Sequence, residues 1–229
     1  YDYIFIDSRT GLSDTGGICT MLLPQILVTI FALNNQNING VSDVAKQAIE
    51  YRFNSLDTRN FNVLPLPSRI DNENSEELKE WIYIYTNKFE NLFKECFLLD
   101  DCTLVNYFNK AKIPYKSEYA YGEKIPVFNE PIDNDLFISY HYNEFCSLIT
   151  QNQNVWEVLS ESQIEENKQK AKIHFIKGKE LLRNERLEES LFEFEKVISL
   201  DNNDSLAYIN CAEILSEIAK TKDSQEAQN

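Results

Sequence analysis

Glycine and proline are scarce in this sequence, with six copies of each among 229 residues. Such low shares disfavour a loop-rich protein or an all-β fold that depends on many tight turns. Hydrophobic residues still make up 43% of the chain and aromatic residues 12%, which is enough for a core of ordinary size. Because Leu, Ile, Glu and Lys favour helices, we expect a globular, mainly helical chain of one or two domains.

Cysteine and histidine are also few, and their spacing excludes several kinds of site. The five cysteines are odd in number, widely spaced and never form a CxxC pair, which disfavours a disulfide framework or a zinc site. They are Cys19, Cys96, Cys102, Cys146 and Cys211. Buried free thiols in a reducing compartment are the simpler interpretation, and they predict a cytoplasmic protein. Neither His141 nor His174 has triad partners around it, so both are expected to be structural.

Basic residues are outnumbered by acidic ones, 22 against 37, and the formal net charge is −15. A surface this negative repels nucleic-acid phosphates and anionic lipids, so nucleic-acid and membrane partners are disfavoured. The acidic excess falls in residues 73–80, 161–166 and 185–195, where solvated helix faces are the simplest interpretation. Basic or neutral proteins remain the favoured class of partner.

The chain contains no apolar run long enough to span a bilayer. The longest stretch, residues 18–33, is interrupted by Thr20, Pro24 and Thr29. The sequence opens at Tyr1 without an initiator Met, inside an apolar run that is typical of a buried strand. We therefore expect this sequence to be a fragment of a longer protein.

Four short apolar runs bounded by turn residues indicate buried parallel strands. They are residues 3–7, 26–33, 62–66 and 113–115. Apolar residues at helical spacing predict helices over residues 42–54, 74–97 and 133–150. Alternating strands and helices predict right-handed crossovers, a parallel sheet covered by helices, and ligand binding at the carboxyl ends of the strands.

The character of the sequence changes after about residue 163, beyond which only helical patterns occur. We assign residues 1–150 to an α/β domain with a partial parallel sheet, residues 151–164 to a polar connector, and residues 165–229 to an α-helical module. The predicted fold class is therefore α/β followed by an α-helical domain.

The first motif places Asp7 at the end of an apolar run and Gly11 four residues later. An Asp at the tip of a strand can hold a water molecule bound to Mg²⁺, and a glycine amide can approach a terminal phosphate closely. A strand that simply ends in a capping Asp and a turn has the same pattern. The spacing alone leaves both interpretations open.

Together with the residues around it, this motif resembles the Walker B and switch II segment of ParA/MinD-like P-loop ATPases. The likeness is to a subgroup that carries tetratricopeptide repeats after the ATPase domain, and the matching residues follow in order along the chain. They are Asp7-Ser8-Arg9-Thr10-Gly11, Asp14, Gly16-Gly17-Ile18-Cys19, Leu23-Pro24-Gln25-Ile26-Leu27-Val28, Asn34, Gln36, Gly40, Pro65, Pro67-Ser68-Arg69-Ile70-Asp71, Ile113-Pro114-Tyr115 and Tyr121-Gly122-Glu123.

The resemblance implies roles for particular residues. Asp7 would hold the metal-bound water and Gly11 would sense the γ-phosphate. Residues 65–71 would lie where relatives place the adenine, with Arg69 and Asp71 as nucleotide contacts. A surface ion pair beside a helix start is the alternative interpretation of Arg69 and Asp71.

The phosphate-binding loop of such ATPases is missing from this sequence. No segment contains the Gly-rich loop that ends in Gly-Lys-[Ser/Thr], so tight ATP binding is not expected from this chain alone. The resemblance implies Mg²⁺-dependent ATP hydrolysis and dimerisation across the nucleotide only for the intact protein. Gly16 and Gly17 could offer amides to an anion or form an ordinary turn. Arg9 could reach a phosphate or pair with Asp14 or Asp2.

The second motif begins at Ala171 and resembles a tetratricopeptide repeat with its period of about 34 residues. Its small and apolar positions are Gly178, Leu181, Leu187, Ser190, Phe194 and Val197, followed by a turn at residues 201–204 and a second start at 205–220. His174 and Lys177 stand where such repeats have large apolar residues, so an unrelated helical hairpin is the alternative. One and a half repeats bury little core, and further repeats are expected beyond Asn229.

These observations predict a nucleotide-switch ATPase whose repeats bind a partner protein. The alternative is a noncatalytic adaptor in which the α/β domain is degenerate and only the repeats act. A DNA-partitioning ATPase is disfavoured by the negative charge and by the repeats. Tyr115, Tyr119 and Tyr121 could stack on a base, although packing at a sheet edge is the simpler interpretation.

Overall fold

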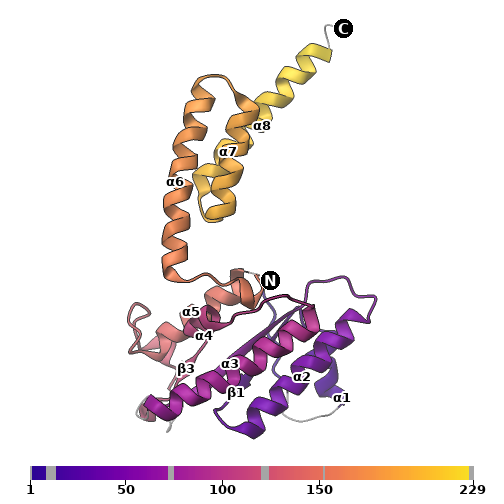
Figure 1. Ribbon diagram of the computed structural model, residues 1–229, viewed down its shortest axis with the longest axis vertical. Coiled ribbons are helices and arrows are strands. Elements are labelled where there is room, and N and C mark those ends of the chain that lie inside the picture. The colour runs from indigo at the N-terminus through magenta and orange to yellow at the C-terminus, as the bar shows by residue number, and fades with distance from the viewer. Residues whose placement is uncertain (1, 9–13, 72–74, 120–123, 152, 227–229) are drawn as a thin grey trace. The chain divides into compact units, whose positions relative to one another are not determined.

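The computed structural model describes residues 2–8, 14–71, 75–119, 124–151 and 153–226. It divides into two compact units, Tyr1–Val158 and Leu159–Asn229. The first is a mixed α/β unit and the second is made of helices (Figure 1).

A three-stranded parallel sheet organises the first unit. Its strands are β1 (Ile26–Phe31), β2 (Asn62–Ile70) and β3 (Ile113–Pro114), in the order β1-β2-β3. The predicted parallel sheet and three of its four predicted strands are thus confirmed. Within the described ranges only β2 pairs with β1, so the other edge of β1 is open.

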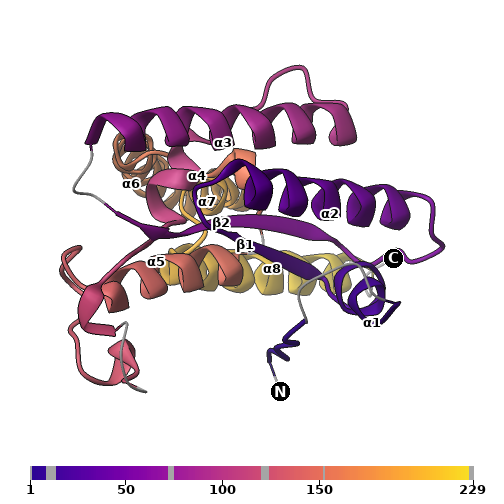
Figure 2. The same ribbon diagram turned by 90° about the horizontal axis from the view of Figure 1, so that it is seen from below.

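Helices cover both faces of this sheet. Figure 2 shows α2 (Asn35–Phe53) and α3 (Ser75–Phe97) on one face and α5 (Ile138–Gln151) on the other. The remaining elements of the unit are short: α1 (Asp14–Gly17), a π-helical turn (Ile18–Leu22), α4 (Val105–Lys110) and three 3₁₀ turns (Ser117–Tyr119, Pro126–Phe128 and Val155–Glu157).

An aromatic cluster fills the space between the sheet and α3. Phe89 is fully buried, and its ring centroid lies 5.6 Å from that of Phe31 and 6.3 Å from that of Phe108. Tyr85 meets Phe108 edge-to-face at 4.8 Å. The apolar face predicted for residues 74–97 is therefore the face that packs on the sheet.

The prediction of a strand at residues 3–7 is wrong. Residues 2–8 form no helix or strand, and the side chains of Ile4 and Phe5 are 81% and 84% exposed. A strand is stable only when its amide and carbonyl groups pair with a neighbour. No other described segment pairs with residues 3–7, so their apolar side chains stay in solvent.

Two helices begin at residues other than those predicted, because side chains cap them. The Asn34 side chain accepts a hydrogen bond from the amide of Asn37 at 2.8 Å, which starts α2 seven residues before the predicted 42 and encloses Gly40 in the helix. The Glu130 carboxylate accepts from the amide of Ser139 at 3.0 Å, and α5 begins at Ile138 instead of 133.

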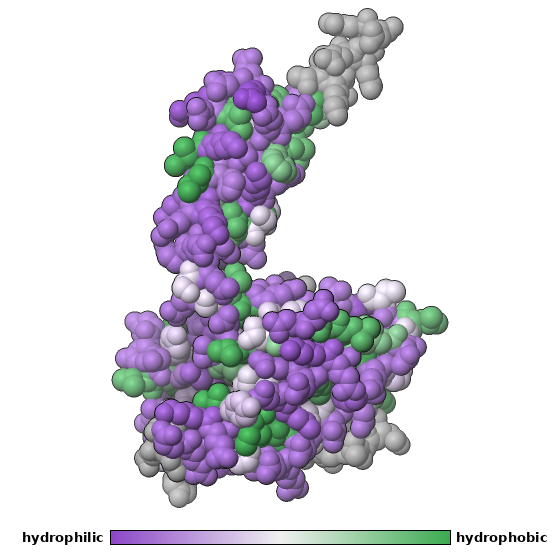
Figure 3. All heavy atoms as spheres, in the orientation of Figure 1, coloured by the Kyte–Doolittle hydropathy of each residue, from purple (hydrophilic) through white to green (hydrophobic). Residues whose placement is uncertain are grey.

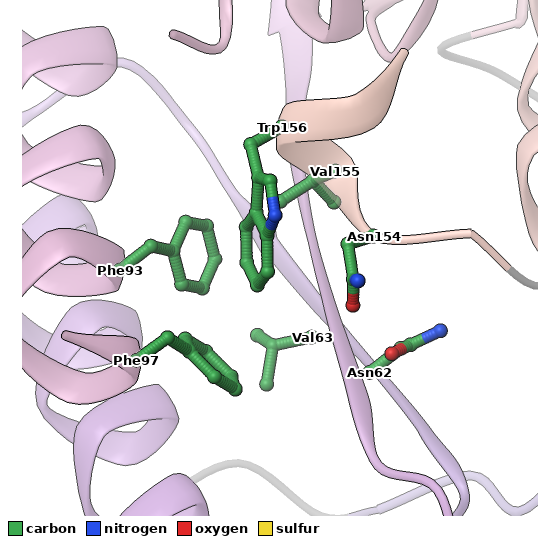
Figure 4. Close-up of a pocket in the computed structure, with 7 residues that line it drawn as sticks. All are labelled: Asn62, Val63, Phe93, Phe97, Asn154, Val155 and Trp156. Carbon is green, nitrogen blue, oxygen red and sulfur yellow. The ribbon is translucent and has the colours of Figure 1, made fainter. Parts of the chain in front are cut away.

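Residues 155–158 of the expected connector belong to the α/β core. Val155 and Val158 are buried, and the Trp156 ring lies 4.9 Å from that of Phe97. Figure 4 shows Trp156 against Phe93 and Phe97, beside a cavity of about 10 Å³. A cavity of that size holds about one water molecule, so it is a packing gap.

The second unit consists of α6 (Glu161–Arg183), α7 (Leu187–Leu200) and α8 (Ser205–Glu226). Its small core is formed by Ala171, Phe194, Val197, Ala207, Cys211 and Ile214. Hydrophilic residues cover most of the visible face of this unit, with scattered apolar patches (Figure 3). Of the helices that the structure describes, none is both long and apolar enough to cross a membrane.

Candidate functional site

The carboxyl ends of β2 and β3 bring together two residues that are far apart in the sequence. The Arg69 guanidinium lies over the Tyr115 ring, 5.8 Å from its centroid, and both residues are exposed. Arg69 has a φ of 57°, a left-handed conformation that is uncommon for a residue with a side chain. Such backbone positions cluster at ligand sites, and the carboxyl edge of a parallel sheet is where α/β proteins bind ligands.

The other residues predicted for a nucleotide site are placed only in part. Asp71 directly follows β2 and is exposed, which agrees with a surface position. Asp7 is exposed in an irregular segment, so it does not stand at the tip of a strand. Gly11, Arg9 and Tyr121 lie outside the described residues.

The glycine pair at Gly16 and Gly17 lies in a helical turn. The Thr20 hydroxyl donates to the Gly16 carbonyl at 2.8 Å, inside the continuous turns of α1 and the following π-helix. A helical turn of this length favours the structural interpretation of these glycines. Within the described ranges no three His, Cys, Asp or Glu side chains are grouped to hold a metal ion.

A cavity of about 290 Å³ lies next to the ends of β2 and β3. Its apolar walls include Ile70, Tyr85 and Phe108, from β2, α3 and α4. Lys112, just before β3, and His141, on α5, supply polar groups to its lining. No local sequence pattern indicates this cavity, because its lining residues come from five separate segments.

His141 is buried and has a defined tautomer. Its Nε2 lies 3.0 Å from the carbonyl oxygen of Asp135, which can only accept, so Nε2 carries the proton and donates it. Burial lowers the pKa of His141, and the charge of Lys112 adds to this effect, so the ring is neutral at pH 7. The expected structural role of His141 agrees with this contact.

A cluster of charges lies at the amino ends of β1 and β2. Arg52 is buried and pairs with Asp57, which also binds Arg59 with an N–O distance of 2.7 Å. Hydrogen bonds from Arg59 hold the pKa of Asp57 below its usual range. Both arginines also donate to the Leu22 carbonyl, so this cluster fastens the chain before β1 to the end of α2. Its contacts are all internal, which indicates a structural role.

The helical unit contains a tight contact between α6 and α7. A Cβ atom placed on Gly178 would lie 3.0 Å from Cζ of Phe194, and Phe194 is fully buried. The hydroxyl of Ser190, also fully buried, donates to the Gly178 carbonyl at 2.8 Å. The residues expected to be small therefore lie in the contact between the two helices.

His174 and Lys177, which do not fit the apolar pattern of a repeat, both pair with one carboxylate. Glu193 on α7 is 3% exposed, with His174 Nδ1 at 2.6 Å from Oε2 and Lys177 Nζ at 3.0 Å from Oε1. Lys196 Nζ is a third partner at 3.1 Å. Glu193 was not among the predicted site residues, although its spacing from Lys196 by three residues on a helix is a usual ion-pair spacing.

Comparison with known proteins identifies no relative: no protein-family model, curated protein or solved structure matches this chain.

Proposed function

We propose that this chain is part of a cytoplasmic nucleotide-switch ATPase of the ParA/MinD-like kind, whose tetratricopeptide-like helices bind a partner protein. The observation that carries the proposal is the Arg69–Tyr115 pair at the carboxyl ends of β2 and β3. There an arginine and an aromatic ring stand where a nucleobase can stack, and Asp71 lies two residues beyond Arg69. The free thiols of all five cysteines agree with a reducing compartment.

The described residues fit a nucleobase better than they fit Mg²⁺. Asp7 is a single exposed carboxylate, and the 229 residues contain no Gly-Lys-[Ser/Thr] loop to hold the phosphates. The proposal therefore assigns the Gly-Lys-[Ser/Thr] loop that cradles the phosphates to a segment outside this sequence. In the switch, Asp7 would bind a water molecule of the metal, and Gly11 would contact the γ-phosphate.

The helical unit supports the protein-binding half of the proposal. The Gly178–Phe194 contact and the buried Ser190 give α6 and α7 the close packing of a repeat hairpin. On the same unit Ile176 and Ile209 are 68% and 52% exposed, which offers apolar surface to a partner. A homodimer that shares the nucleotide is part of the same proposal.

A noncatalytic adaptor is the second candidate. The exposed position of Asp7 in an irregular segment favours it, because a metal-binding Asp needs a fixed position. In an adaptor only the repeat helices would act, and the α/β unit would be a spacer.

Mg²⁺-ATP binding separates the two candidates. In the protein as its gene encodes it, we expect calorimetry to detect Mg²⁺-ATP binding, with the affinity of the Asp7→Ala variant reduced about tenfold because the metal-bound water loses its acceptor. Asp2→Ala removes an exposed carboxylate from the same segment and should leave the affinity unchanged. Failure of the unaltered protein to bind ATP would establish the adaptor instead.

A further inference from the structure

The cavity beside β3 is built differently from the surface where Arg69 and Asp71 lie, and neither of those residues lines it. Its volume of about 290 Å³ is close to the lower end of the range of small-molecule sites, about 300 Å³. Much of its wall is apolar, so an apolar ligand group would replace poorly bonded water there.

Two aromatic side chains form one wall of this cavity. Tyr85, on α3, is 2% exposed, and Phe108, on α4, is 4% exposed. Their rings meet edge-to-face with centroids 4.8 Å apart, which fixes both in the core. A rigid aromatic wall favours a flat ring in the ligand, because a flat ring loses no rotamer freedom on binding.

The polar groups of the lining set the charge and the hydrogen bonding of the ligand. Lys112 is half-buried and lies close enough to His141 for its charge to act on that ring. His141 donates from Nε2 to the Asp135 carbonyl, and its Nδ1 is therefore an acceptor. Asp135 is exposed, so its carboxylate can remain in water. The lining thus offers a cation, an acceptor and aromatic walls.

We propose that this cavity binds a small aromatic monocarboxylate, with the carboxylate at Lys112, the ring against Tyr85 and Phe108, and a ring N–H or O–H donor facing His141. The ligand would act as an effector and not as the nucleotide. The proposal does not depend on ATP binding, because it uses none of the residues assigned to that site.

Calorimetry with indole-3-acetate tests the proposal, since this probe combines a flat ring, a ring N–H and one carboxylate. We expect saturable binding to the full chain, about tenfold weaker binding to the Lys112→Gln variant, and about tenfold weaker binding of the uncharged analogue indole-3-acetamide. Lys110→Gln is the matched control, because Lys110 lies on α4 outside the lining and carries the same charge.

Several results would overturn the proposal. Absence of saturable indole-3-acetate binding, equal affinities for the acid and the amide, or equal losses in Lys112→Gln and Lys110→Gln would each do so. Displacement of the probe by Mg²⁺-ATP would assign the cavity to the nucleotide instead. Binding of indole-3-acetate is measured without ATP. Absence of that binding therefore leaves the result of the ATP experiment unaffected.

Discussion

Replacement of Glu193 by Gln will lower the free energy of unfolding of the helical unit by about 3 kcal/mol at pH 7. The Glu193 side chain is 4% exposed and receives hydrogen bonds from His174, Lys177 and Lys196 at 2.6, 3.0 and 3.1 Å. Gln keeps one acceptor oxygen but turns an NH₂ group toward a cation. The loss is smaller than the sum of three charged hydrogen bonds, because the Lys177 and Lys196 side chains are 58% and 36% exposed and regain water.

The same cluster makes the stability of the helical unit depend on pH. Burial of Glu193 opposes ionisation, but the hydrogen bonds from His174, Lys177 and Lys196 outweigh it and lower the pKa from 4.5 to about 2. Because the folded pKa lies below the unfolded one, this stabilisation is fully present above pH 4.5 and is lost as the pH falls toward 2. Glu193→Gln should remove that part of the acid dependence.

Hydrogen exchange of the α6 and α7 amides measures the unfolding free energy of this unit directly. Glu195→Gln is the matched control, because Glu195 is exposed on the same helix and should change the exchange free energies by less than about 0.5 kcal/mol. Equal protection in the Glu193→Gln and unaltered proteins would mean that the three cations do not stabilise the hairpin.

Replacement of Gly178 by Ala will destabilise the helical unit by about 2 kcal/mol, although Ala is the better helix former. The new Cβ would lie 3.0 to 3.2 Å from three atoms of the Phe194 ring. That ring is fully buried, so relief of the contact requires α6 and α7 to separate or Phe194 to leave its position.

Gly40→Ala, by contrast with Gly178→Ala, is expected to stabilise the chain. Gly40 lies inside α2, and a Cβ atom there would have no neighbour within 4 Å. The substitution should therefore stabilise the α/β unit by about 0.5 to 1 kcal/mol through the unfolded state. Hydrogen exchange resolves both effects, and stabilisation by Gly178→Ala would show that the two helices do not pack as closely as the structure indicates.

The parts of the fold that the sequence predicted are those with strong local patterns. Apolar runs bounded by turn residues located β1, β2 and β3, and the helical spacing of Tyr85, Phe89 and Phe93 located α3 together with its buried face. The parallel order followed because strands and helices alternate. The prediction failed at residues 3–7, where the apolar pattern of a strand is present but none of the strands in the described part of the chain pairs with it.

The ends of the helices and the position of the cavity could not be predicted, because they depend on contacts between residues that are distant in the sequence. Glu130 caps α5 from eight residues before its first residue, and Leu104 donates its amide to Glu90, 14 residues earlier, at the start of α4. α4 is only six residues long and was not predicted. The cavity at Lys112 and His141 needs five segments to converge, so sequence spacing could not indicate it.

The predicted nucleotide site is described only in part, at the surface near the ends of β2 and β3. Arg69 and Tyr115 were separate candidates, and the parallel pairing of β2 with β3 brings them into contact. The structure places the Arg69 guanidinium over the Tyr115 ring and leaves Asp71 exposed just beyond β2.

The open edge of β1 is expected to affect self-association of the chain in solution. An unpaired strand edge can recruit the same edge of another molecule, and Ile30 on β1 is 61% exposed. The net charge of −15 opposes such encounters at low ionic strength, where like charges repel over tens of ångströms. Added salt shortens that range to about 8 Å at 0.15 M, so self-association measured by light scattering should increase as salt is added. Storage in dilute buffer should therefore keep the chain monomeric longer than storage in concentrated salt.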